Sequence, residues 1–360
     1  MKRLNEKEWK IFPAFSDNGL FHIATTSSSI DAVRLKGGED KTVPYVTRSD
    51  VSNGIARFVS AENYDFGSDD GGCITVGLDT QTAFYQPHKF VTGQNVHVIT
   101  GEQLSEEIAC FLVTILREQM QAKFNWGGNG ATLGRMKRLL VMLPVDDDGK
   151  PDYDYMAQYA SEMREGMLMR YKKFIAEQLA QLEYKKILAL DEKEWKDIEL
   201  GQIANISSGR DIYAQERTSG DTPYITSGTA NNGIGYFVGN DNDSKAKNAI
   251  SVNRNGAVGE AFYHPYEALY GNDCRRVNLH NADDEATQLF VALCISNQKK
   301  AFSYSRKLGT ARLKRLHIML PVTDSGEPDY AYMEQYVKNM MLRKYRQYLA
   351  YLDRQKQRQE

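Results

Sequence analysis

Residues 6–10 read Glu-Lys-Glu-Trp-Lys, and the same five residues return at 192–196, which is 186 positions later. Seven further stretches recur in the same order at offsets of 177 to 179: 44–47 with 223–226, 53–55 with 232–234, 58–59 with 237–238, 83–85 with 261–263, 137–139 with 314–316, 143–145 with 320–322, and 149–153 with 326–330. Matches that keep one order at a nearly constant offset indicate a tandem duplication. We therefore predict two copies of one domain.

Each copy consists mainly of short apolar runs separated by Gly, Asn, Asp and Ser, such as 71–77 and 249–253. Short apolar runs separated by such turn-forming residues predict strands and turns. One helix is expected in each copy, from Ser105 to Met120 and from Asp284 to about Phe302. Ser105, followed by two glutamates, is typical of a helix N-cap and first turn.

The end of each copy differs from the strand-rich part before it. In the first copy no proline follows Asp152 up to about Leu190, and apolar residues recur there every three or four positions. This spacing predicts a helix with one apolar stripe, about 35 residues and roughly 50 Å long. We expect the two long helices to pack on each other as a coiled coil. The seam would bury six side chains: Met156, Met163, Met167, Met333, Met340 and Tyr348. The alternative is that each stripe covers the core of its own domain.

These patterns give an α+β fold class with two tandem domains and two long helices. The boundaries that we expect are 1–150 for the first domain, 151–190 for the first long helix, 191–327 for the second domain and 328–360 for the second long helix.

The composition suits two ordered domains, since 41% of the 360 residues are hydrophobic and 26% are charged. The formal net charge of −2 gives no global positive field, although local basic faces remain compatible with it. Four distant cysteines without a Cys-x-x-Cys pair make a disulfide framework and a zinc site unexpected. Because the sequence has neither a signal peptide nor an 18-residue apolar run, we expect a cytoplasmic protein with no membrane contact.

Catalytic motifs are missing from the sequence. It has no Walker-type Gly-Lys-Ser/Thr and no Gly-x-Gly-x-x-Gly, and the six histidines lack metal-ligand spacing. Three aspartates at 146–148 resemble an acidic metal cluster, but their counterpart at 323–325 is Thr-Asp-Ser, which indicates a turn. We therefore expect no catalytic residue, no metal and no cofactor in this chain.

Positive charge gathers at the same place in both copies. Residues 119–145 and 286–322 contain no acid, but they contain four and seven basic residues respectively. Local positive charge of this kind neutralises the phosphates of a DNA duplex. We predict backbone contacts from Arg135 and Lys137 in the first copy and from Arg312 and Lys314 in the second. A solvated face with clustered charge is the alternative.

The two copies differ most in their polar loops, which are 47–53 against 226–232 and 76–80 against 252–256. Arginine suits guanine and asparagine suits adenine in the major groove. The loops supply eight candidates for base contacts: Arg48, Ser49, Asn53, Ser227, Asn231, Asn232, Arg254 and Asn255. Each of these residues could equally be a turn former.

Several motifs carry a resemblance to a known family: Leu-Gly-Gln-Ile-Ala at 200–204, Pro-Tyr-Ile-Thr at 223–226 and Asn-Arg-Asn-Gly-Ala-Val-Gly at 253–259. In this order they resemble the specificity subunits of type I restriction–modification enzymes, and the layout is similar also to type IIB specificity subunits. The second copy matches best. The first departs from the pattern at 76–79, which reads Val-Gly-Leu-Asp.

The resemblance implies two target-recognition domains that each bind one half of a split, asymmetric sequence in double-stranded DNA. It implies that the two long helices pack antiparallel as a spacer. It also implies methyltransferase subunits as partners, which hold S-adenosylmethionine, with a restriction and translocase subunit as an optional further partner.

Two other hypotheses remain open at this stage. A tandem carbohydrate- or protein-binding β module joined by coiled coils explains the duplication and the helices, but not the matched basic windows. A nuclease fused within one copy would require a catalytic motif that the sequence lacks.

Overall fold

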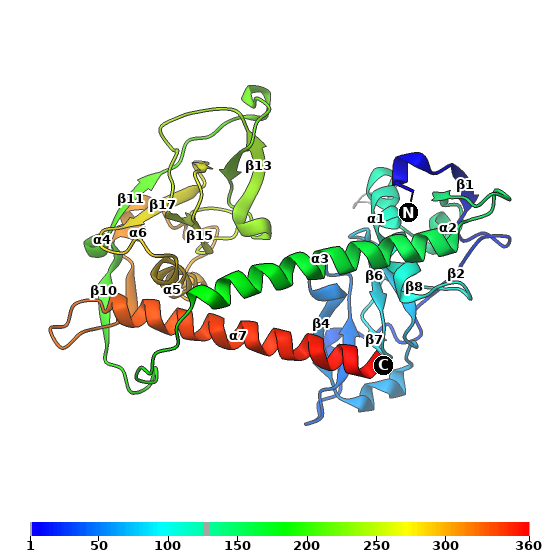
Figure 1. The fold of residues 1–360 in the computed structure, drawn as a ribbon, viewed down its shortest axis with the longest axis horizontal. Coiled ribbons are helices and arrows are strands. Elements are labelled where there is room, and N and C mark those ends of the chain that lie inside the picture. Colours follow the sequence, from blue (N-terminus) through cyan, green and yellow to red (C-terminus); the bar gives the residue numbers. More distant parts are fainter. Residues whose placement is uncertain (1, 125–129, 360) are drawn as a thin grey trace. The chain divides into compact units, whose positions relative to one another are not determined.

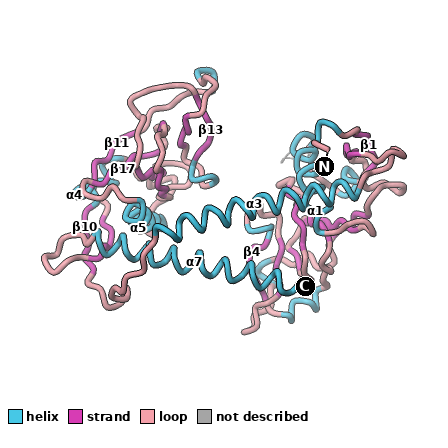
Figure 2. Tube along the Cα trace, viewed as in Figure 1, coloured by secondary structure: helices cyan, strands magenta, loops and turns pink. Residues whose placement is uncertain are grey.

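The computed structural model describes residues 2–124 and 130–359, which form two compact units, Met1–Tyr171 and Lys172–Glu360 (Figure 1). We call them unit 1 and unit 2 and describe each by itself. Figure 2 shows that each unit combines strands with helices and long loops, which confirms the α+β class.

Unit 1 contains a four-stranded antiparallel sheet, a three-stranded sheet and one separate strand pair. The four strands, in sheet order, are β2 (His22–Thr25), β8 (Val96–Thr100), β5 (Cys73–Gly77) and β6 (Thr82–Gln86). The three are β4 (Ile55–Val59), β3 (Val43–Val46) and β7 (Val91–Thr92), and β3 runs parallel to β7. The separate pair joins β1 (Trp9–Pro13) to β9 (Leu140–Pro144).

In unit 1, α1 (Glu106–Lys123) covers one face of the larger sheet. The short helices are α2 (Leu133–Met136) and four 3-10 helices at Leu4–Glu6, Ala32–Arg34, Ser52–Gly54 and Ala61–Phe66. The Ser105 hydroxyl accepts a hydrogen bond from the Ile108 amide at 3.3 Å, which confirms the predicted N-cap. Ile74 of the central strand packs in the same core cluster as Leu112 of α1, whereas its neighbour Cys73 faces the smaller sheet.

Unit 2 repeats this arrangement with the same strand order in both sheets. The larger sheet contains β11 (Ala204–Ser208), β17 (Cys274–Leu279), β14 (Ala249–Asn253) and β15 (Ala261–His264). The smaller contains β13 (Ile234–Val238), β12 (Thr222–Ile225) and β16 (Leu269–Tyr270), and the separate pair joins β10 (Trp195–Glu199) to β18 (His317–Pro321). The helices are α4 (Leu200–Ile203), α5 (Glu285–Ser296), α6 (Thr310–Lys314) and 3-10 helices at Ala214–Glu216, Ala230–Gly233 and Lys299–Ala301.

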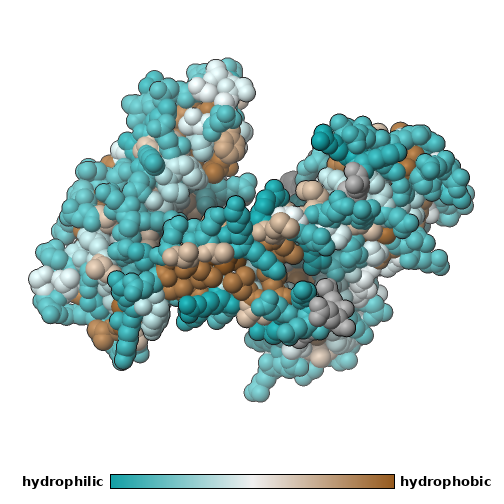
Figure 3. All heavy atoms as spheres, viewed as in Figure 1, coloured by the Kyte–Doolittle hydropathy of each residue, from teal (hydrophilic) through white to brown (hydrophobic). Residues whose placement is uncertain are grey.

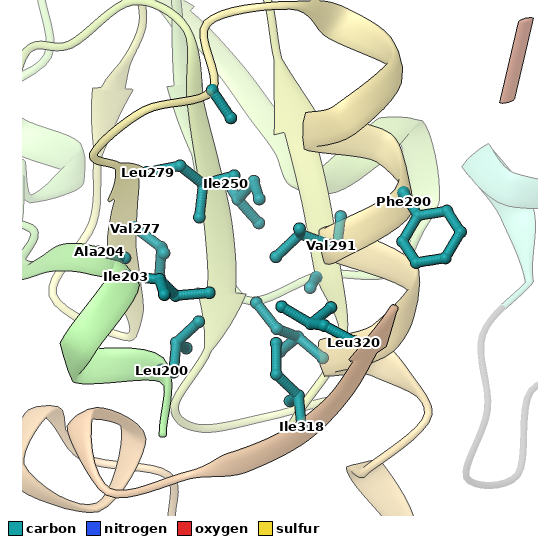
Figure 4. Close-up of a cluster of buried hydrophobic side chains, with 14 of the residues drawn as sticks. Leu200, Ile203, Ala204, Ile250, Val277, Leu279, Phe290, Val291, Ile318 and Leu320 are labelled. Carbon is teal, nitrogen blue, oxygen red and sulfur yellow. The ribbon is translucent and has the colours of Figure 1, made fainter. Parts of the chain in front are cut away.

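The core of unit 2 lies between its larger sheet and α5. Figure 4 shows Ile250 and Val277 of the sheet facing Val291 of α5, with Ile318 and Leu320 of β18 closing the cluster. Alternate residues of β14 and β17 point into this layer because side chains alternate along a strand.

Each long helix is anchored in the core of its own unit. The helices are α3 (Tyr153–Gln181) and α7 (Tyr330–Gln359). Met156 in the first turn of α3 is fully buried in the core of unit 1, and Met333 of α7 is fully buried in that of unit 2. Tyr159 packs edge-on against Phe111 of α1, and its counterpart Tyr336 packs edge-on against Phe290 of α5.

The predicted seam between the two long helices stays a prediction as a whole. Met163 and Met167 are 46% and 54% exposed, and Met156 and Met333 fill domain cores, as the alternative proposed. Met340 and Tyr348 are half-buried. Each stripe begins in the core of its own unit, and Figure 3 shows hydrophobic residues gathered over the long helices.

Within unit 2, the last turns of α3 do pack on α7. Ile175 is fully buried, and Phe174 lies edge-on to Tyr345. The residues after α3 reach back toward the start of α7, where the Tyr332 hydroxyl donates to the Leu188 carbonyl. The two chain directions are therefore opposed within this unit.

The first long helix ends nine residues earlier than the predicted Leu190, because residues 182–190 are not helical. Side chains of α7 bind the backbone of this segment. Asn339 bonds both the amide and the carbonyl of Lys185, and Gln335 donates to the Glu183 carbonyl. These bonds replace the intrahelical ones that continued helix would provide.

An ion pair holds the start of each long helix. Asp152 accepts a hydrogen bond from the Tyr155 amide and pairs with Lys7 at 2.6 Å; Asp329 does the same with the Tyr332 amide and pairs with Lys193 at 2.8 Å. Burial opposes ionisation of both carboxyls, but the hydrogen bonds from the lysines and amides outweigh it and lower the pKa of each. Each aspartate is therefore a charged N-cap.

Replacing Asp329 by alanine is expected to lower the free energy of unfolding of unit 2 by about 1–2 kcal/mol, because the cap and the partner of Lys193 are both lost. Urea denaturation monitored by tryptophan fluorescence measures this change. Asp324→Ala, in the exposed turn before the helix, is the matched control and should change little. Equal stability of the two variants would contradict the capping role.

A buried polar pair differs between the units. In unit 1 the Gln86 side chain donates to the Thr75 hydroxyl at 3.0 Å, and at the same place in unit 2 His264 bonds Ser251 at 2.8 Å. His264 is fully buried, and burial lowers its pKa from the usual 6.5 to about 4. The imidazole is therefore neutral in the folded protein at neutral pH.

Because the folded pKa of His264 lies below the unfolded value, the unfolded chain takes up the proton first as the pH falls. Stability from this group is thus lost between about pH 6.5 and 4, and we expect a decrease of about 2 kcal/mol between pH 7 and 5. His264→Gln, which copies unit 1, should have a shallower pH dependence in urea titrations. Parallel curves for the variant and the parent would contradict the assignment.

Candidate nucleic-acid interface

Three segments of unit 1 meet at the end of the β5–β6 hairpin: the loop 47–54, the turn 78–81 and residues 130–135. The Ala131 amide donates to the Leu78 carbonyl at 2.9 Å, and the Arg135 side chain donates to the Gly130 carbonyl at 3.0 Å. The basic helix α2 is thereby fixed beside the hairpin. We call this edge, and its equivalent in unit 2, the rim.

The structure brings two predicted residues, Arg48 and Arg135, to the rim of unit 1. Arg48 pairs with Asp79 of the hairpin turn, and Asp79 also accepts a bond from the Asn95 side chain at 3.3 Å. The close approach depends on Gly77, since a Cβ there would lie 2.9 Å from that of Arg48. Lys137 is exposed just after α2.

The rim of unit 2 has the same backbone connections. The Leu308 amide approaches the Arg254 carbonyl at 3.4 Å, and the Arg254 amide donates to the Asp273 carbonyl at 2.8 Å. Loop 226–233 is tied on by the Asn253 side chain, which donates to the Gly228 carbonyl at 3.1 Å. The guanidinium of Arg254 pairs with the Asp273 carboxylate at 3.2 Å.

A hollow of about 690 Å³ lies at this rim and is lined by four cationic side chains. They are Arg254, Lys307, Arg312 and Arg315, and the hollow also contains Tyr304. No acidic residue is among the described residues that line it. Such a surface is suited to phosphate oxygens, which arginine binds through charge-assisted hydrogen bonds. Arg254 and Arg312 thus lie together, whereas Lys314 is exposed beyond the hollow.

The loop asparagines have a turn role. Asn53, Asn231 and Asn232 have φ of 57°, 50° and 52°, in the left-handed region that asparagine tolerates. The Asn53 side chain donates to the Tyr85 carbonyl, and the Ser49 hydroxyl accepts from the Val51 amide. Asn232 lines a different hollow, with Lys299 and Lys300. All three asparagines are exposed, and base contacts from these loops and from Ser227 stay a prediction.

Among residues 2–124 and 130–359, no group of three or more His, Cys, Asp and Glu side chains is placed to hold a metal ion. In the same described ranges, no helix has the length and apolar character needed to cross a membrane.

The sequence pattern of the type I restriction modification DNA specificity domain matches the chain twice, at residues 7–168 and 192–348. The chain belongs to this specificity family. It is 30% identical over 330 residues to the type II restriction enzyme specificity subunit S.BcgI of Heyndrickxia coagulans. This match covers 91% of this chain and 94% of that one. Family membership decides for DNA recognition over the carbohydrate- or protein-binding alternative.

Two solved structures are similar to this specificity subunit. The S subunit of a type I restriction–modification system from M. genitalium is 16% identical, with a TM-score of 0.47, and the match covers 98% of this chain and 95% of that one. The HsdS subunit of Thermoanaerobacter tengcongensis is 14% identical, with a TM-score of 0.33, and the match covers 87% and 84%.

The rims of the specificity subunit contain residues that the sequence did not single out. Asp79 and Asp273 contact the predicted Arg48 and Arg254, Asn95 contacts Asp79, and Tyr304 lines the cationic hollow. The acid-free window pointed toward Lys307 and Arg315. The aspartates carried no signal, because they stand at positions that do not correspond in the two copies.

Proposed function

We propose that unit 1 and unit 2 each read one half of a bipartite DNA sequence. The observation that carries this proposal is the repeated rim: one framework, built twice, presents Arg48 in unit 1 and Arg254 in unit 2 from different loops. Two similar scaffolds with unlike side chains are suited to two different half-sites.

We further propose that the subunit passes this recognition to methyltransferase subunits, which hold S-adenosylmethionine, and that it carries no catalytic residue or cofactor of its own. The family match to specificity domains over most of the chain supports this division of labour. A restriction and translocase subunit is a further partner in this proposal, and the cytoplasm is the proposed location.

Methylome sequencing of cells that express the chain with its cognate methyltransferase tests the proposal. The expected result is a methylated motif made of two short sequences separated by a fixed gap. A single continuous motif, or methylation independent of sequence, would contradict it. Cells with the methyltransferase alone are the control and should lack the motif.

A further inference from the structure

Each rim contains one carboxylate that contacts both an arginine and an asparagine. We call this set the clamp. In unit 1 it consists of Asp79 with Arg48 and Asn95. In unit 2, Asp273 contacts Arg254 at 3.2 Å and the Asn255 side chain at 3.4 Å.

The two clamps are built from exchanged positions. The Leu78 amide donates to the Asn95 carbonyl, and the equivalent bond in unit 2 runs from Arg254 to Asp273. Asn95 therefore corresponds to Asp273, and Asp79, one residue after Leu78, corresponds to Asn255. The aspartate and the asparagine have changed places, while the contact between them has remained.

The arginine also comes from different elements. Arg48 lies in the loop after β3, and Arg254 follows β14 directly. An ion pair inherited as part of the framework would keep its positions in both copies. What the two rims share is the arrangement of the three groups, which indicates that the arrangement itself has a role.

We propose that Asp79 and Asp273 are positioning residues for DNA recognition: each holds its arginine in the orientation that contacts DNA, and each opposes binding to non-cognate DNA. A free arginine side chain loses much rotamer freedom when it binds, and a carboxylate behind it reduces that loss. The side chains of Arg48 and Arg254 remain 45% and 28% exposed, so donors are left for a ligand.

Two buried polar atoms in the clamp of unit 2 also lack a hydrogen-bond partner among the described residues. Within the described part of the chain, the Arg254 Nε and the Asn255 Oδ1 are buried without a hydrogen bond. Buried polar atoms are normally satisfied in the functional state. Base edges or phosphates carried into the adjacent cationic hollow would bring matching acceptors and donors.

The charge of the clamp has a separate effect. The DNA phosphates repel the clamp carboxylate. Only the contact of the arginine with its cognate base offsets this repulsion. Removing the charge should therefore loosen recognition and strengthen non-specific binding together. Simple damage to the fold would weaken both.

The test rests on the proposed function and uses the full chain with duplexes that carry the motif found by methylation sequencing. Competition binding compares Asp79→Asn and Asp273→Asn with the parent. We expect each variant to lose roughly tenfold preference for the cognate bases in its own half only. Binding to an unrelated duplex should rise roughly twofold to fivefold at low salt.

Each half is the control for the other, and Asp65→Asn, which removes an exposed carboxylate paired with Lys36, controls for charge alone. Unchanged base preference, or equal loss of cognate and unrelated binding, would overturn the proposal. A parent protein without a two-part preference would instead refute the proposed function.

The double variant Asp79→Asn with Asn95→Asp gives unit 1 the arrangement of unit 2 and keeps the charge. Its binding to the unrelated duplex should equal that of the parent. If it binds that duplex as strongly as Asp79→Asn alone, the charge effect is refuted. Asn95 has φ 62°, which aspartate also tolerates, so the fold accepts the exchange.

Discussion

Replacing Arg312 and Lys314 together by alanine is expected to weaken binding to every duplex by about the same factor and to reduce the salt slope by roughly two units. Arg312 lines a hollow whose described lining residues include no acid, and Lys314 is exposed and is not one of those lining residues. Phosphate contacts carry no sequence information, so specific and unrelated duplexes should lose affinity alike.

If two phosphate contacts are lost, raising the salt from 50 to 200 mM should reduce the DNA affinity of the variant by a factor about tenfold smaller than it reduces that of the parent. Fluorescence anisotropy at several salt concentrations measures the slope. Arg135→Ala with Lys137→Ala should act in the same way through unit 1. Lys172→Ala with Lys173→Ala, which removes equal charge from α3, is the control, and a slope unchanged by the rim variants would exclude these contacts.

Exchanging residues 11–145 for the same region of a relative with a different motif should replace one half of the recognised sequence completely and leave the other half and the gap intact. The structure favours this design, because Ile11 pairs with Met142 and both junctions fall at one strand pair. The core of unit 1 is thereby transferred almost whole.

Methylome sequencing of the hybrid measures the outcome. The reciprocal exchange of residues 197–322 has its junctions at the pair of β10 and β18 and should change the other half. Loss of both halves in a hybrid that still folds would refute independent reading. Circular dichroism and thermal unfolding establish that each hybrid is folded.

Much of the fold could be predicted from the sequence, because the duplication shows the same motifs and the same helix spacing in both copies. The two copies, the N-cap at Ser105 and the long helices all follow from order and spacing. Residues 182–190 could not be predicted, since long-range bonds from Gln335 and Asn339 decide their conformation. The burial of Met156 and Met333 in the cores of their own units could not be decided from the sequence, because an apolar stripe does not reveal which partner covers it.

The candidate site was predictable in part for a related reason. A shortage of acids marks a basic surface whatever the fold, so Arg135 and Arg312 could be selected from sequence. The clamp could not be predicted, because Asp79 and Asp273 stand at positions that do not correspond in the two copies. Only the backbone hydrogen bonds from residue 78 to residue 95 and from residue 254 to residue 273 show that the two clamps are equivalent.

The anchoring of the long helices has a mechanical consequence. Met156 and Met333 place the first turns of α3 and α7 inside the cores of their own units, and the Lys7 and Lys193 ion pairs hold the helix starts. Neither helix begins on a flexible linker that could absorb motion. Each helix start is therefore fixed rigidly to the core of its own unit, so the direction in which the helix leaves that unit is set by the packing of the unit itself.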